Sequence, residues 1–94
     1  MLHTTKIDIA KETREKLIGI LGQRLADGTD LKSQAKQAHW NVKGANFIAL
    51  HELFDRVATE LDPIVDDIAE RITTLGGTAL GTVRVAAQSS TLSE

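Results

Sequence analysis

Four side chains of types that commonly bind metal ions occur in the chain as two pairs. The pairs are His51 with Asp55 and Asp66 with Glu70, each spaced four residues apart. In a helix, residues i and i+4 lie one above the other, so each pair can direct two ligand groups at one point. At about 100° per residue, the four residues span roughly 100° of arc, beside the apolar face and distinct from it. Imidazole and carboxylate groups in this pattern are suited to binding a divalent metal ion.

The two pairs are too far apart on one helix to share an ion. His51 and Glu70 are 19 residues apart, which corresponds to about 28 Å at 1.5 Å per residue. Metal–ligand bonds are only roughly 2 Å long. A two-fold axis near Glu60 and Leu61 would place the first pair of one copy opposite the second pair of an antiparallel copy. Such a dimer would hold two equivalent sites.

A third candidate ligand, His39, lies in the stretch KQAHWNVKGANFIALHELFD, residues 36–55, next to Trp40. This stretch contains two of the three histidines, the only tryptophan and both phenylalanines. Other interpretations remain open from the residues alone. An acidic strip is typical of a solvated helix face, His39 could cap a helix end, and Trp40 could be core or interface bulk. We interpret His3 as solvated, and Glu52 and Asp67 as surface charges.

Two long helices must position these residues. We expect an extended arm over residues 1–8 and a first helix from near Ile9 to Val42, with an apolar stripe of helical period. The run Asp27-Gly28-Thr29-Asp30 favours a turn locally, so propensity alone leaves one long helix or two short ones. The segment Val42–Asn46 is predicted to be a turn, with Gly44 at C′ of the first helix and Asn46 as N-cap of the next.

The second helix is predicted to run from Phe47 to Leu75 and to stop at Gly76-Gly77. Its apolar residues recur at i, i+3, i+4 and i+7 on both sides of Pro63. Pro63 should therefore kink the helix rather than end it. One short helical turn is expected near Val85–Gln88. The apolar residues that define the stripe of the second helix are Leu50, Leu53, Phe54, Val57, Leu61, Ile64, Val65, Ile68, Ile72 and Leu75.

The expected architecture is an all-α helical hairpin, and its composition excludes several classes of function. At 94 residues it is at most one domain. The net charge of −2 provides no global attraction to nucleic acid. The absence of cysteine excludes thiolate sites and fits a cytoplasmic location. We expect no membrane span and no signal peptide. Each helix has more apolar surface than one neighbour can cover, so further helices from another copy or chain are expected to pack against it.

The stretch of residues 36–55, followed by DDIAERITTLGGTALGT, resembles the signature of the Dps family, the DNA-binding proteins from starved cells in the ferritin-like superfamily. The family's spacing H-x11-H-x3-D-x10-D-x3-E is filled by His39, His51, Asp55, Asp66 and Glu70. The resemblance implies that these five residues form a ferroxidase centre. The first three would come from one subunit and the last two from its two-fold mate. It also implies that the first helix is continuous.

The resemblance further implies oxidation of Fe²⁺ to Fe³⁺, with hydrogen peroxide as the usual oxidant, iron storage, and protection against oxidative stress. Family members are homo-oligomers, typically dodecamers, built from two further long helices that this sequence lacks. We therefore expect residues 1–94 to form one ferritin-like domain, half of a four-helix bundle. A complementary C-terminal half is a possible partner. The alternative interpretation is a non-catalytic helical hairpin that only self-associates.

Binding to DNA is not expected to be strong. In family members that bind DNA, a lysine-rich tail commonly does so. The arm through Asp8 carries only Lys6 as a fixed positive charge. Phosphate contacts dominate affinity for DNA, and one or two cations contribute little.

Overall fold

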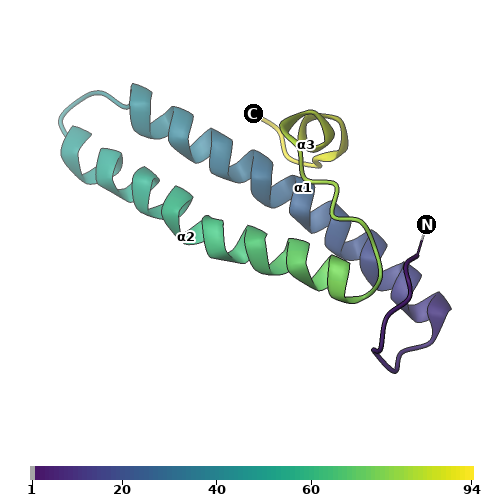
Figure 1. Cartoon of the computed structure of the whole chain (residues 1–94). Helices are drawn as coiled ribbons and strands as arrows, with labels where there is room; N and C mark the ends of the chain where they lie inside the picture. The colour runs from purple at the N-terminus through teal and green to yellow at the C-terminus, as the bar shows by residue number, and fades with distance from the viewer. Residues whose placement is uncertain (1) are drawn as a thin grey trace.

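The computed structural model describes residues 2–94 and contains three helices, α1 (Lys11–Asn41), α2 (Phe47–Thr74) and α3 (Val83–Ser89). The two long helices form an antiparallel hairpin, and α3 packs on α1 (Figure 1). This confirms the all-α hairpin and the bounds of both long helices to within two residues. The short helix begins two residues earlier than predicted, because the Thr82 side chain accepts a hydrogen bond from the Val85 amide and caps it. Of the expected arm, Met1 lies outside the described residues. No helix in residues 2–94 is long and apolar enough to cross a membrane.

The first helix is continuous through the Asp27–Asp30 run, and packing explains why. Asp27 is buried, and its carboxylate accepts hydrogen bonds from Thr91, which lies far along the chain. Gly28 faces α2, where an added Cβ would lie 3.0 Å from Cγ2 of Val65. Residues that favour a turn in isolation therefore serve tertiary contacts in the middle of a helix.

The turn between the long helices differs in detail from the prediction. The C-cap of α1 is Val42 in an extended conformation, so Gly44 lies at C″ rather than C′, with φ 106°. Asn46 occupies the N-cap position of α2 as predicted, but its side chain makes no capping hydrogen bond. The helix continues through Pro63.

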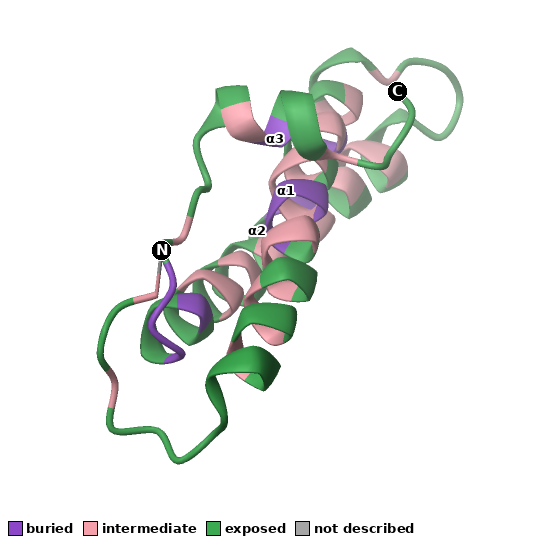
Figure 2. Ribbon diagram, turned by 90° about the vertical axis from the view of Figure 1, so that its right-hand side faces the viewer, coloured by how far each residue is buried: buried purple, intermediate pink, exposed green. Residues whose placement is uncertain are grey.

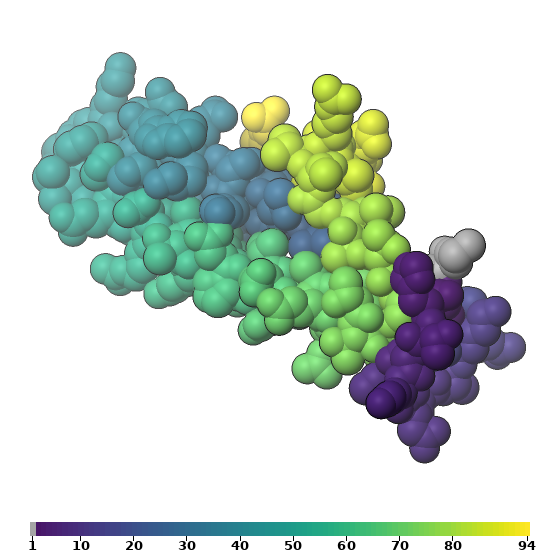
Figure 3. All heavy atoms as spheres, in the orientation of Figure 1, coloured from purple at the N-terminus to yellow at the C-terminus, as the bar shows by residue number. Residues whose placement is uncertain are grey.

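The C-terminus of α2 is closed by backbone hydrogen bonds and by the N-terminal arm. Gly77 N–H donates to the Ile72 carbonyl and Gly76 N–H to the Thr73 carbonyl, which is a Schellman motif with Gly76 at φ 92°. The arm lies across this end (Figure 3), where Thr5 Oγ1 donates to the Thr74 carbonyl at 2.8 Å. Arg14 donates to the Leu75 carbonyl at 3.1 Å. The arm and Arg14 thus bind carbonyls that the helix leaves unpaired.

The core is thin. Figure 2 shows the few buried residues on α1 and α2, in the turn after α2, and on α3, where Ala86 is buried. Only Ile72 and Leu75 of the ten predicted stripe residues of α2 are buried, whereas Leu53 and Ile64 are exposed. The hairpin therefore leaves much of its apolar stripe uncovered, as the sequence predicted.

Candidate metal centre

His39 and His51 lie face to face at the turn end of the hairpin. His39 is in the last turn of α1 and His51 is near the start of α2. The short connection from Val42 to Asn46 brings them together, and their ring centroids are 3.8 Å apart with an interplanar angle of 25°. The Phe47 ring also stacks on the His51 ring, with centroids 5.0 Å apart. The two histidines that the family resemblance assigned to one half of a site therefore lie side by side in the structure.

The two histidines orient each other through reciprocal hydrogen bonds. His39 Nδ1 lies 2.6 Å from the His51 carbonyl oxygen, and His51 Nδ1 lies 2.8 Å from the His39 carbonyl oxygen. A carbonyl oxygen only accepts, so both Nδ1 atoms must carry protons. In the neutral ring this leaves the lone pair on Nε2. Fixing the other ring nitrogen to a carbonyl is the usual way in which proteins prepare a histidine to bind a metal.

Asp55 lies one turn after His51 and is paired with Lys36 of α1. Lys36 Nζ and Asp55 Oδ1 are 2.9 Å apart, and the two side chains are 36% and 48% exposed. The hydrogen bond from Lys36 and its positive charge lower the pKa of Asp55, and His39 and His51 add to this effect. The sequence analysis did not single out Lys36. Its position three residues before His39 was an available signal, because residues i and i+3 share a helix face.

The second pair lies elsewhere on α2. Asp66 is 11 residues beyond Asp55, about 16 Å along a helix. A hydrogen bond with Asp66 and the negative charge of Asp66 raise the pKa of Glu70, with smaller contributions from desolvation and from Asp67. The pair is exposed, so its two carboxylates can approach a ligand outside this chain. Two carboxylates this close repel each other when ionised, and a bound cation would relieve that repulsion.

The five predicted ligands therefore form two separate groups within one chain. His39, His51 and Asp55 lie at the turn end, and the other two lie further along α2. Over residues 2–94, no three histidine, aspartate or glutamate side chains converge closely enough to hold a metal ion. Trp40 is 67% exposed beside the histidine pair. The assignment of the five residues as ligands remains a prediction.

Comparison with known proteins shows which family the chain belongs to. The pattern of the ferritin-like domain matches residues 18–93. A DNA protection during starvation protein of Agrobacterium fabrum is 48% identical over 90 residues, which covers 96% of this chain and 56% of that protein. The structure of DpsC from Streptomyces coelicolor superposes with a TM-score of 0.95 at 34% identity, over 100% of this chain and 55% of that one. Mycobacterium smegmatis Dps superposes with a TM-score of 0.91 at 31% identity, over 99% and 56%.

The fold and the matched domain define the ferritin-like class of helical proteins. Within that class, the chain belongs to the Dps family. It spans about half the length of the relatives that it matches.

Proposed function

We propose that this chain supplies both halves of an inter-subunit iron-oxidising site of the Dps type. One half is His39, His51 and Asp55 of one copy, and the other is Asp66 and Glu70 of a second copy. The observation that carries the proposal is the reciprocal hydrogen bonding of the two histidines, which leaves both Nε2 atoms free to bind a cation. The resemblance of the whole ligand pattern to the family supports the same assignment.

The donor set fits ferrous iron. Neutral imidazole and anionic oxygen bind Fe²⁺ well, and no thiolate is required. Asp55 is held ionised by Lys36, so the carboxylate is ready to bind a cation once the ammonium group moves away. The opposite half contributes carboxylates whose mutual repulsion favours cation binding. The protein's role is to position the ions and match their charge, and the metal supplies the redox chemistry.

The proposed reaction is oxidation of two Fe²⁺ by one hydrogen peroxide. Each iron gives up one electron, the O–O bond is broken, and two protons are taken up to give two Fe³⁺ and two water molecules. Supplying both electrons from two ions held together avoids release of hydroxyl radical. The ferric product would be stored as mineral in an oligomeric shell, which protects against oxidative stress. Assembly of the shell and the participation of a complementary C-terminal half are part of the proposal.

A second candidate function is self-association of the hairpin without catalysis. The exposed apolar residues of α2, Leu53 and Ile64 at 44% and 52% exposure, favour it. Burial of such side chains against another helix is stabilising at roughly 25 cal/mol per Å² of apolar area. The two functions differ in whether dimerisation creates a saturable iron site.

An anaerobic titration with Fe²⁺, followed by Trp40 fluorescence, tests the proposal. Trp40 follows His39 in the chain and its side chain is largely exposed to solvent, so its fluorescence should respond to an ion bound at His39. We expect saturable quenching at one or two irons per chain. Quenching should be lost in Asp66→Asn, which removes a ligand far from the histidine pair and the hairpin turn. It should also be lost in His51→Ala.

His3→Ala is the matched control, since His3 lies outside both ligand groups and its exposed side chain lies 3.5 Å from the Thr78 hydroxyl. It should quench like the unsubstituted chain. Absence of saturable quenching in the unsubstituted dimer would refute the proposed site and leave self-association as the function. Saturable quenching that survives Asp66→Asn would show that the second pair is not part of the site.

A further inference from the structure

Asp27 is a buried carboxylate that the proposed iron chemistry does not use. It lies on α1 12 residues before His39, about 18 Å away along the helix. Its charged neighbours on α1 are Arg24, whose guanidinium lies 3.1 Å from Oδ2, and Asp30 one turn further on. Buried carboxylates are rare unless they are paired and hydrogen-bonded, so the partners of Asp27 indicate its role.

Most of those partners come from the segment after α3. The Thr91 amide donates to Asp27 Oδ1 at 2.8 Å, and the Thr91 hydroxyl lies 3.0 and 3.1 Å from the two carboxylate oxygens. The Ser90 hydroxyl lies 3.4 Å from Asp27 Oδ1 and 2.6 Å from Asp30 Oδ2. One side chain of α1 thereby holds two successive residues of the C-terminal segment through charge-assisted hydrogen bonds.

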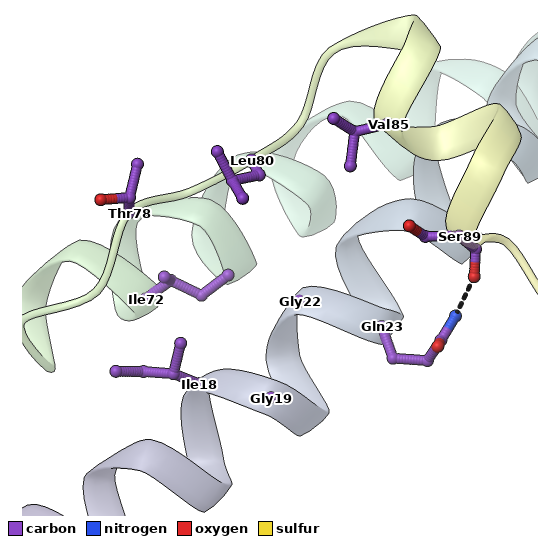
Figure 4. Close-up of a pocket in the computed structure, with 9 residues that line it drawn as sticks. All are labelled: Ile18, Gly19, Gly22, Gln23, Ile72, Thr78, Leu80, Val85 and Ser89. Carbon is purple, nitrogen blue, oxygen red and sulfur yellow. Dashed lines mark hydrogen bonds between the residues drawn. The ribbon is translucent and has the colours of Figure 1, made fainter. Parts of the chain in front are cut away.

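The contacts continue one residue earlier. Gln23 Nε2 donates to the Ser89 carbonyl at 2.7 Å (Figure 4). The same nitrogen lies 3.3 Å from Asp27 Oδ1, so Gln23 and Asp27 form one network. Every buried side-chain nitrogen and oxygen in residues 2–94 has a hydrogen-bond partner. Without the Asp27 carboxylate, Ser90 would keep Asp30 and Gln23 would keep the Ser89 carbonyl. The Thr91 amide and hydroxyl, however, would lose the acceptor that ties them to α1.

Apolar packing alone holds α3 weakly. The helix has seven residues, which is too short for stability in isolation. Ala86 is its only buried residue, and Val83 is 79% exposed. On α1, the buried Leu25 side chain approaches the connection before α3, where a Cβ added at Gly81 would lie 3.3 Å from it.

We propose that residues 83–92 form a detachable lid on α1 and that Asp27 is its latch. The lid and the connection from α2 border an open cleft of about 270 Å³, lined by apolar side chains that include Ile18, Ile72 and Leu80 (Figure 4). When the latch is lost, the lid separates from α1 as a unit, the cleft widens, and the α1–α2 hairpin stays folded. This device is independent of iron binding.

Hydrogen exchange of the full chain, read by mass spectrometry, tests the latch in Asp27→Asn. This change keeps the shape of the side chain but replaces one carboxylate oxygen with an NH₂ group, which cannot accept a hydrogen bond. In one orientation the NH₂ group faces the Arg24 guanidinium, and in the other it faces the Thr91 amide. We expect exchange in residues 83–92 to become roughly tenfold faster or more, with residues 47–74 unchanged. An apolar dye should bind more strongly as the cleft opens. Asp8→Asn makes the same change of charge in the arm, and its hydrogen exchange and dye binding should equal those of the unsubstituted chain.

Two results would overturn the proposal. One is unchanged exchange in residues 83–92, and the other is equal acceleration over the whole chain, which would make Asp27 a general stabilising residue. If Asp27→Asn does not fold, Thr91→Val decides the matter because it leaves the carboxylate in place and removes one of its donors. It should loosen residues 83–92 selectively, and failure to do so would also refute the latch.

Discussion

The proposed site is shared between two chains, and this can be tested by mixing two variants that each fail to bind Fe²⁺. His51→Ala damages one half of the site, and Glu70→Gln damages the other. Each site takes one half from each chain, so a homodimer of either variant has two damaged sites. In a dimer containing one chain of each kind, one site receives both damaged halves and the other receives both intact halves.

The expected recovery follows from this geometry. Random exchange between equal amounts of the two variants makes about half of the dimers mixed, and each mixed dimer has one intact site of two. The mixture should therefore bind about a quarter of the Fe²⁺ bound by the unsubstituted chain. The distance along α2 between the two residues, about 28 Å at 1.5 Å per residue, excludes recovery within one chain.

The assay is the anaerobic titration of Trp40 fluorescence after subunit exchange, with the dimeric state of each variant checked by light scattering. Each variant alone should show no saturable binding. Failure to recover binding in the mixture, although both variants are dimeric and exchange subunits, would refute the shared site. Full stoichiometry in either variant alone would show that its substituted residue is not a ligand.

Three further predictions concern single residues. Lys36→Gln should tighten Fe²⁺ binding a few-fold, because it removes the cation that competes for Asp55, and weaker binding in the same titration would contradict this. The pKa of Asp27 is lowered by its hydrogen bonds from Thr91, so its contribution to stability is complete above the usual carboxyl range and is lost as pH falls through the lower folded value. The protection of residues 83–92 against hydrogen exchange, corrected for the intrinsic exchange rate at each pH, should thus fall below about pH 4, and Asp27→Asn should lose that dependence. Gly76→Ala should lower the free energy of unfolding, measured by thermal unfolding, by more than about 1 kcal/mol. The reason is that φ of Gly76 is 92° and an added Cβ would lie 2.5 Å from the His3 carbonyl oxygen. At Gly19 no atom lies within 4 Å of an added Cβ, so Gly19→Ala should raise the free energy of unfolding by about 0.5–1 kcal/mol. Equal effects of the two substitutions on stability would refute the argument.

The helices and the histidine cluster could be predicted from sequence because their causes are local. The apolar period of α2 continues in phase past Pro63, and Gly76-Gly77 marks its end, so both bounds follow from short-range rules. The continuity of α1 did not follow in this way. Propensity left the Asp27–Asp30 run undecided, since the contacts that favour a helix there come from Thr91 and Val65, far along the chain.

The details of the site depended on which residues face one another across the hairpin. The family resemblance implied that His39 and His51 belong to one half of a site, but nothing in the sequence predicted that each Nδ1 would bind the other's carbonyl. The pairing of Lys36 with Asp55 likewise needs the register of the two helices, which is set by packing along the whole seam. The sequence also predicted that the two candidate pairs on α2 are too distant to act together within one chain, and the continuous helix from Phe47 to Thr74 keeps them apart.

The long sequence separation of the latch has a consequence for the order of folding. Asp27 and Thr91 are 64 residues apart in the chain, whereas the α1–α2 seam grows outward from a short turn. Closing a long loop costs more chain entropy than extending a hairpin already begun. The hairpin should therefore form first and provide the surface on which residues 83–92 settle. On unfolding, the same segment should be the first to leave, and its release rate then measures the strength of the latch without contribution from the rest of the fold.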